Sequence, residues 1–142
     1  MSRYVGIDLH RRRSVVVILD PDGTRVSSRR IESAPMNLAA AVADAGPEPE
    51  VVLEATWGWH WAADVIEEAG GRVHLAHPWG VKGFENRRVK NDDRDATLLA
   101  DLWRMGSLPE SWIAPRSLRQ LRELVRYRHK LSKLRTGLKS QV

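Results

Sequence analysis

The sequence contains no cysteine, and this absence limits the metal sites that the chain can form. Without cysteine there is no disulfide framework and no thiolate metal site. Any bound metal must therefore take oxygen or imidazole ligands. Oxygen ligands favour hard ions such as Mg²⁺ or Mn²⁺.

Long hydrophobic runs are absent as well. The N-terminal segment reaches charged residues after a short apolar run, and no apolar stretch approaches the roughly 20 residues of a membrane-spanning helix. We therefore expect a cytoplasmic protein with no membrane partner. The length of 142 residues suits one compact domain with a core, followed by an appendage.

Positive charge is concentrated near the C-terminus. The formal net charge is +5 at pH 7, yet residues 115–142 contain nine lysines and arginines and only one acid, Glu123. Lysine and arginine side chains bind phosphates with release of counterions, so this tail is suited to nucleic acid. A solvated helix face explains the same pattern equally well.

Hydrophobic periodicity and turn residues predict an α/β fold. Three strands joined by short turns, one of them containing Pro21, Asp22 and Gly23, must form an antiparallel meander. Two strand–helix units follow, which implies parallel pairing with right-handed crossovers. The expected strands are residues 4–10, 14–19, 25–32, 50–55 and 73–76, and the expected helices run from 33 or 37 to 45, from 58 to 69 and from 92 to 105.

This order of elements is that of the ribonuclease-H-like fold. We expect a mixed five-stranded sheet flanked by helices and followed by a long basic helix. Residues 78–91 and 108–115 are expected to be irregular. The domain boundary is placed after residue 114, which gives a domain of residues 1–114 and a helix of residues 115–142.

The last helix has an apolar seam with a spacing of three and four residues, which is typical of the start of a coiled coil. A simple amphipathic helix that packs on its own domain is the alternative. The helical pattern continues to Val142, so we expect the chain to be part of a longer protein. The seam consists of Leu124, Tyr127, Leu131, Leu134 and Leu138.

Two acids lie at the ends of apolar strands. Asp8 follows Val5, Gly6 and Ile7, and a buried carboxylate in such a strand must shift its pKa or bind a cation. Glu54 ends a second apolar strand in the same way. Because these strands are neighbours in the expected topology, both acids can share one metal.

Asp92 and Asp95 lie three residues apart at the start of a helix, so their carboxylates share one face. Helix capping and interaction with the helix dipole explain this pair by itself more simply. Together with Asp8 and Glu54, however, the pair completes a cluster of four acids. Asp93 and Asp101 do not share that face and are left outside.

Four neighbouring carboxylates repel one another unless cations are bound. Two Mg²⁺ ions about 4 Å apart would offset this repulsion and stabilise the attacking and leaving oxygens of a displacement at phosphorus. We therefore predict that the catalytic and metal-binding residues of a phosphodiester-cleaving site are Asp8, Glu54, Asp92 and Asp95.

Other side chains near these acids suit nucleic acid. His10 lies on the same strand face as Asp8 and is a further candidate for the site. Three tryptophans after Glu54 suggest base stacking, although packing in the core or at an interface is the more common role. Basic residues flank the acids and predict phosphate contacts, with an ordinary charged loop as the alternative. The tryptophans are Trp57, Trp59 and Trp61, and the basic residues are Arg11, Arg12, Arg13, Lys82, Arg87, Arg88 and Lys90.

Three ordered motifs carry a resemblance to a known family: Gly6-Ile7-Asp8-Leu9-His10, Val52-Leu53-Glu54-Ala55-Thr56, and Lys90-Asn91-Asp92-Asp93-Arg94-Asp95-Ala96. Together they resemble the N-terminal domain of the insertion-sequence 110 family, the DEDD transposases related to the Piv invertase. The resemblance covers residues 3 to about 105. Asp93 is an additional carboxylate beside the matched acids.

The resemblance implies a RuvC-like domain whose four acids bind Mg²⁺. It also implies DNA recombination guided by a structured noncoding RNA, and assembly of subunits through the coiled coil. In that family a second, C-terminal domain carries a serine nucleophile. We do not find that domain here, so we expect this chain alone to be inactive in recombination.

Three other interpretations remain open. A nucleotide-binding domain of the actin and sugar-kinase type begins similarly, but it needs a small, glycine-rich turn where this chain has His10 and three arginines. A RuvC-like Holliday-junction nuclease would share the fold and the acids. A non-enzymatic module for nucleic-acid binding or dimerisation would use the acids only for capping and ion pairs.

Overall fold

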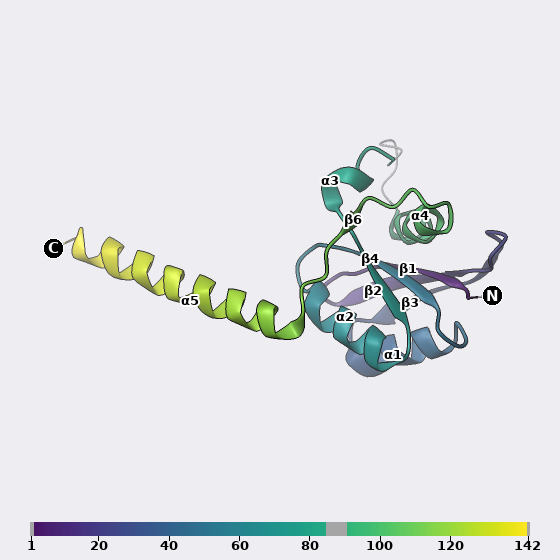
Figure 1. The fold of residues 1–142 in the computed structure, drawn as a ribbon, viewed down its shortest axis with the longest axis horizontal. Helices are drawn as coiled ribbons and strands as arrows, with labels where there is room; N and C mark the ends of the chain where they lie inside the picture. Colours follow the sequence, from purple (N-terminus) through teal and green to yellow (C-terminus); the bar gives the residue numbers. More distant parts are fainter. Residues whose placement is uncertain (1, 85–90, 142) are drawn as a thin grey trace. The chain divides into compact units, whose positions relative to one another are not determined.

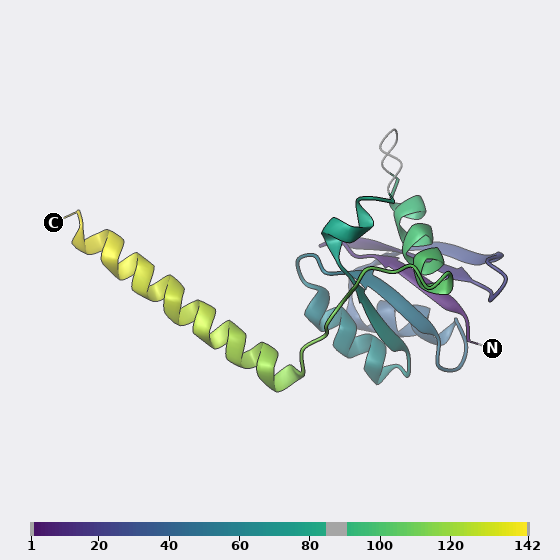
Figure 2. The ribbon, with the colours of Figure 1, turned by 45° about the horizontal axis from the view of Figure 1, so that its top comes forward.

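A mixed six-stranded sheet forms the centre of the first part of the chain (Figures 1 and 2). The computed structural model describes residues 2–84 and 91–141. The strand order is β3-β2-β1-β4-β5-β6, in which β1, β2 and β3 form the antiparallel meander and β4 and β5 run parallel to β1. The strands are β1 (Tyr4–Asp8), β2 (Arg13–Leu19), β3 (Arg25–Glu32), β4 (Glu50–Glu54), β5 (Arg72–Ala76) and β6 (Glu110–Ser111).

The five expected strands are confirmed, and β6 is an addition. It pairs antiparallel with the end of β5, inside the segment that was expected to be irregular. Two residues are too few to show an alternating pattern, so sequence periodicity does not reveal this strand. The same explanation applies to α3 (Pro78–Val81), a single helical turn in the other segment expected to be irregular.

Helices cover both faces of the sheet (Figure 1). α1 (Pro35–Ala43) and α2 (Trp59–Glu68) lie on one face, and α4 (Asp92–Arg104) lies on the other. Because side chains alternate along a strand, each central strand contributes apolar residues to both layers. Under α4 they form two clusters, one of Val15, Val17, Leu19, Ala96 and Ala100 and one of Val52, Ala76, Val81, Leu99 and Leu102.

Gly6 allows the backbone of α4 to approach β1 closely. A Cβ atom at Gly6 would lie 1.8 Å from the carbonyl oxygen of Ala96 and 3.0 Å from the amide nitrogen of Ala100. Both are backbone atoms of the helix, so neither can move aside alone. Asp8 lies two residues further along β1 and therefore on the same face, near the start of α4.

A second contact attaches the first turn of α4 to the edge strand β3. The Asp93 carboxylate lies 2.9 Å from a guanidinium nitrogen of Arg25 and accepts a hydrogen bond from the Ser28 hydroxyl. The Ser28 hydrogen bond and then the Arg25 guanidinium lower the pKa of Asp93 below the ordinary value of 3.8. Asp93 thus has a structural partner on β3.

The C-terminal part of the chain forms a compact unit of its own, Trp112–Val142. It contains α5 (Arg116–Lys139), the expected long basic helix. The Arg119 side chain donates a hydrogen bond to the carbonyl oxygen of Ala114 at 3.0 Å, just before the helix. All five residues of the predicted seam are exposed within this unit. Among the described residues, no helix is long and apolar enough to cross a membrane.

Replacing Gly6 with alanine is expected to lower the free energy of unfolding by about 3 kcal/mol or more, at or above the upper end of the usual cost of overpacking, because the added methyl group collides with the backbone of α4. Urea denaturation followed by circular dichroism measures this loss. The matched control is Gly46→Ala, where φ is +94° but no atom lies within 4 Å of the added Cβ. The control should cost only the backbone strain, about 1–2 kcal/mol. Equal losses for both variants would contradict the close contact at Gly6.

Replacing Asp93 with asparagine is expected to destabilise the chain at neutral pH by less than about 1 kcal/mol, because the ion pair is partly exposed. A carboxylate with a lowered folded-state pKa stabilises the fold above its ordinary pKa, and this stabilisation is lost as the pH falls through the folded value. The difference between the wild type and the variant should therefore disappear well below pH 3.8, the ordinary aspartate pKa. Urea midpoints measured across this range provide the test. Glu68→Gln, at the exposed end of α2, is the control.

Candidate metal-binding site

The parallel pairing of β1 and β4 brings two of the predicted acids to the same edge of the sheet. Ile7 lies opposite Leu53 in the register, and Asp8 and Glu54 are the next residues on the two strands. Both side chains lie on the face that α4 covers, because Gly6 and Val52, two residues earlier, contact that helix. The site is therefore built where two core strands end beneath the start of a helix.

A pocket of about 280 Å³ opens at this edge. Three of the four predicted acids line it: Asp8 from β1, Glu54 from β4 and Asp95 from α4. Apolar side chains of α3 and α4 form another part of the wall. The complete lining consists of Asp8, Leu9, His10, Arg11, Glu54, Thr56, Trp57, Val81, Asp95, Leu98 and Leu99.

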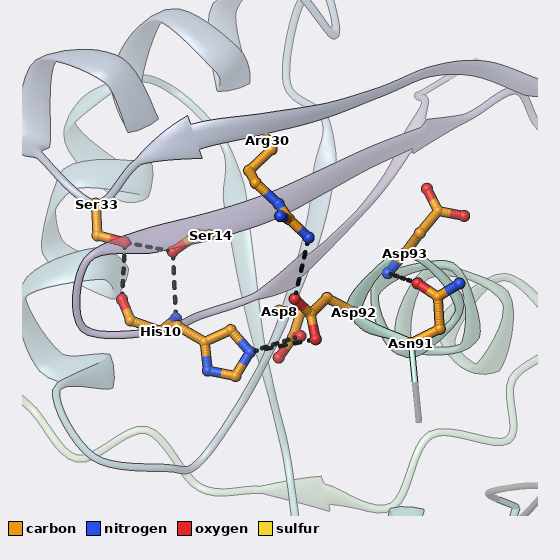
Figure 3. A network of polar contacts seen from close by, with 8 residues as sticks. All are labelled: Asp8, His10, Ser14, Arg30, Ser33, Asn91, Asp92 and Asp93. Atoms are coloured by element: carbon orange, nitrogen blue, oxygen red, sulfur yellow. Dashed lines mark hydrogen bonds and ion pairs between the residues drawn. The ribbon is translucent and has the colours of Figure 1, made fainter. Parts of the chain in front are cut away.

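The fourth acid, Asp92, lies close to Asp8, and the side chain of His10 is near both carboxylates (Figure 3). The Nε2 atom of His10 lies 2.9 Å from the Oδ2 atom of Asp8 and 3.8 Å from the Oδ1 atom of Asp92. One potential ligand atom from each of these three residues lies within 4.8 Å of the others. The structure thus brings all four predicted acids to one end of the sheet.

Sequence reasoning did not find the residues that support His10 and Asp92. The amide nitrogen of His10 donates to the Ser14 hydroxyl at 3.3 Å, and the Ser33 hydroxyl donates to the His10 carbonyl oxygen at 2.7 Å (Figure 3). The two hydroxyls are themselves 2.7 Å apart. On β3, a guanidinium nitrogen of Arg30 lies 3.4 Å from the Oδ2 atom of Asp92. No periodic pattern marks these three polar residues.

The first turn of α4 directs its acids to different partners. The side chain of Asn91, not that of Asp92, caps the helix by accepting a hydrogen bond from the amide of Asp93 at 3.0 Å. Asp93 pairs with Arg25 of β3, Asp95 lines the pocket, and Asp92 lies between His10 and Arg30 of β3. The capping interpretation of Asp92 is therefore wrong, because the residue before it occupies the capping position.

Four of the seven predicted nucleic-acid contacts are among the described residues. Arg11 lines the pocket, Arg12 is exposed in the connection between β1 and β2, and Arg13 is exposed at the start of β2. The ammonium group of Lys82 lies 4.7 Å from the centre of the Trp79 ring. The other three predicted residues, Arg87, Arg88 and Lys90, lie outside the described residues.

Trp57 does not pack in the core, which was one of the roles expected for the tryptophans after Glu54; an interface role or base stacking remains compatible with its exposure. It is 78% exposed and lines the pocket, whereas Trp59 and Trp61 are partly buried at the start of α2. The Arg11 guanidinium lies 5.9 Å from the centre of the Trp57 ring. An aromatic face and a cation therefore lie beside the carboxylates.

The chemistry of this donor set fits a divalent metal ion. Carboxylate oxygens are preferred by Mg²⁺ and Mn²⁺, and an imidazole nitrogen such as that of His10 is compatible with Mn²⁺. The side chains of Asp8 and Asp92 are partly accessible to solvent, so an ion can reach them. The residues present are thus able to hold a hard cation.

Comparison with known proteins identifies the family. The model of the DEDD transposases of insertion sequence 110, described as "Transposase", matches residues 5–142. A search of the curated proteins found no match. Among solved structures, RuvC of T. thermophilus in complex with a Holliday junction substrate is similar, with a TM-score of 0.52 and 14% sequence identity.

The match to RuvC covers 78% of this chain and 100% of the RuvC chain. At this level of identity the similarity shows the fold alone, which is RuvC-like and thus ribonuclease-H-like. The family match extends over the domain that carries the four acids and over α5. The chain therefore belongs to the insertion-sequence 110 family of DEDD transposases.

Proposed function

We propose that this chain is the metal-binding catalytic part of a DNA transposase that acts on phosphodiesters. The observation that carries this proposal is that Asp8, Glu54 and Asp95 line one pocket, and that Asp92 lies close to Asp8 and His10. Membership of a transposase family supports DNA as the substrate. A RuvC-like Holliday-junction nuclease would use the same four acids.

The four acids would hold Mg²⁺ or Mn²⁺, each with a different position in the site. Asp8, Glu54 and Asp95 offer carboxylate oxygens inside the pocket. Arg30 and His10 orient the Asp92 carboxylate from two sides. When bound, the divalent metal would supply electrostatic stabilisation of the charge that develops on the phosphodiester oxygens.

Basic side chains would hold the DNA backbone at this site. Arg11 lies at the pocket, where its guanidinium can pair with a phosphate oxygen in two-point geometry. Arg12 and Arg13 follow Arg11 in the sequence, and Lys82 follows the pocket residue Val81; all three are exposed and would contribute phosphate contacts that carry no base-sequence information. Arg87, Arg88 and Lys90 remain predicted contacts of the same kind.

The remaining features of the mechanism follow from the family resemblance. We propose that a structured guide RNA selects the DNA target and that recombination requires a serine nucleophile from a second domain. Residues 1–114 would then form the catalytic domain, and residues 115–142 the start of the coiled-coil helix. Under this proposal the present chain binds metal and nucleic acid but does not recombine DNA alone.

α5 would join subunits into a homo-oligomer through its exposed seam. Five apolar or aromatic side chains recur at three- and four-residue spacing along 24 helical residues. Leu121 and Val125 are also exposed near the start of the helix, but from Arg126 to Lys139 the residues outside the seam are mainly polar or basic. The seam residues there form a narrow stripe of the kind that packs against an equivalent helix. Burial of this stripe between subunits would remove large apolar side chains from water.

Replacing Asp8 with asparagine is expected to weaken Mn²⁺ binding by on the order of 100-fold, because one anionic ligand becomes a neutral amide. Asp92→Asn should also weaken binding, whereas the neighbouring Asp93→Asn should not, because Asp93 contacts Arg25 and Ser28. Isothermal titration calorimetry with MnCl₂ or MgCl₂ measures each affinity. Unchanged affinity in Asp8→Asn would instead favour the non-enzymatic module.

Replacing Leu131 with aspartate is expected to convert the oligomer into a monomer, because a charge in the centre of the seam must otherwise be buried without a partner. Ser132→Asp adds the same charge one residue away, off the seam, and should leave the assembly intact. Sedimentation-velocity ultracentrifugation distinguishes these states. A monomeric wild-type chain, or equal effects of both substitutions, would contradict assembly through α5.

A further inference from the structure

Trp57 is held in an exposed position by the chain around it. The amide of Ala55 donates to the carbonyl oxygen of Ala76 at 2.9 Å, and the amide of Thr56 donates to the carbonyl oxygen of Glu54 at 2.7 Å. Gly58 then adopts a left-handed conformation with φ of +82°, and α2 begins at the following residue. A short, hydrogen-bonded turn thus holds Trp57 three residues after Glu54, which is a predicted metal ligand.

This exposure is not accounted for by packing. Trp57 leaves 78% of its surface accessible although burial of so large an apolar side chain would stabilise the fold. Two other tryptophans of the chain are similarly exposed, Trp79 at 77% and Trp112 at 68%, but neither lines the pocket. Trp57 is therefore distinguished by its position at the carboxylate site.

The positively charged side chain of Arg11 lies close to the Trp57 ring. Its guanidinium lies 5.9 Å from the centre of the Trp57 ring, and both residues line the pocket that contains Asp8. A guanidinium near an aromatic face is held by cation–π attraction while its donors remain available to an anion. The pair therefore combines a flat apolar face with a phosphate-binding group.

We propose that Trp57 and Arg11 form a binding site for an unpaired DNA base next to the phosphodiester at the carboxylates. An indole ring stacks on any nucleobase whose flat face is accessible. In a continuous duplex each base is stacked between its neighbours, so only an unpaired nucleotide can turn its face to Trp57. Arg11 then contacts the phosphate of that nucleotide.

This inference rests on the proposed function and makes it more specific. The preferred substrate is DNA with an unpaired nucleotide beside the reacting phosphate, such as a junction or a partly melted strand, and not an intact duplex. Trp57 acts as a positioning residue, because stacking fixes the nucleotide relative to Asp8 and Glu54. The three acids that line the same pocket make an apolar protein segment a poor occupant of it.

The test compares two labelled duplexes of the same sequence, one fully paired and one with a single unpaired thymine. Fluorescence anisotropy measures their affinities for the full 142-residue chain, with Ca²⁺ in place of Mg²⁺ so that no strand is cut. We expect the wild type to prefer the duplex with the unpaired thymine by about tenfold. Trp57→Ala should abolish this preference, and Trp57→Phe, which retains an aromatic face, should keep most of it.

Trp112→Ala is the matched control, because Trp112 is also exposed and also has a guanidinium, that of Arg122, 5.7 Å from its ring centre. It should leave the ratio of the two affinities unchanged. A wild-type chain without preference, or a Trp57→Ala variant that keeps it, would overturn the inference. An equal loss of affinity for both duplexes in Trp57→Ala would also count against it.

Metal titration separates this inference from the proposed function. Trp57→Ala should bind Mn²⁺ as the wild type does, since it supplies no ligand. If the wild type prefers the unpaired thymine but binds no metal, the base site stands and the proposed function fails. If it binds metal through Asp8 but shows no such preference, the proposed function stands and the base site is disproved.

Discussion

The close contact between the backbone of α4 and Gly6 determines where the acids of this helix lie. A helix can approach a strand this closely only where the strand has no side chain, and Gly6 is in the middle of β1. The small residues Ala96 and Ala100 of α4 are buried at the same contact. Because α4 begins at the end of β1 that carries Asp8, the contact brings Asp92 and Asp95 toward the two strand acids.

The three acids in the first turn of α4 have different roles: Asp93 stabilises the fold, whereas Asp92 and Asp95 belong to the candidate metal site. Asp93 is attached to β3 by Arg25 and Ser28, and this contact lowers its pKa. Asp95 lines the pocket, and Asp92 lies between His10 and Arg30. Three acids within four residues thus have three environments, which depend on the direction of each side chain around the helix axis.

Much of the fold was predictable because its signals are local and repeated. Short continuous runs of apolar, often β-branched residues identify β1, β2 and β4, and glycine and proline mark several of the connections along the chain. β6 and α3 were missed because each spans only about one period of its own pattern, so the pattern does not repeat. Asp8 and Glu54 were recognisable because an acid that ends a core strand needs a partner. Ser14, Ser33 and Arg30 were not, because only the folded chain brings β2, β3 and the loop at His10 together.

The sequence by itself determined the class of this protein: the order of its strands and helices, the four acids and the basic last helix. These properties depend on residue type and spacing along the chain, which are visible without coordinates. The tertiary structure alone decided which residues of β3 contact Asp92 and Asp93, which residue caps the helix and that Trp57 lies exposed at the pocket. The physical reason is that exposure and pairing depend on distances between segments far apart in the sequence, and these distances exist only once α4 has packed on the sheet.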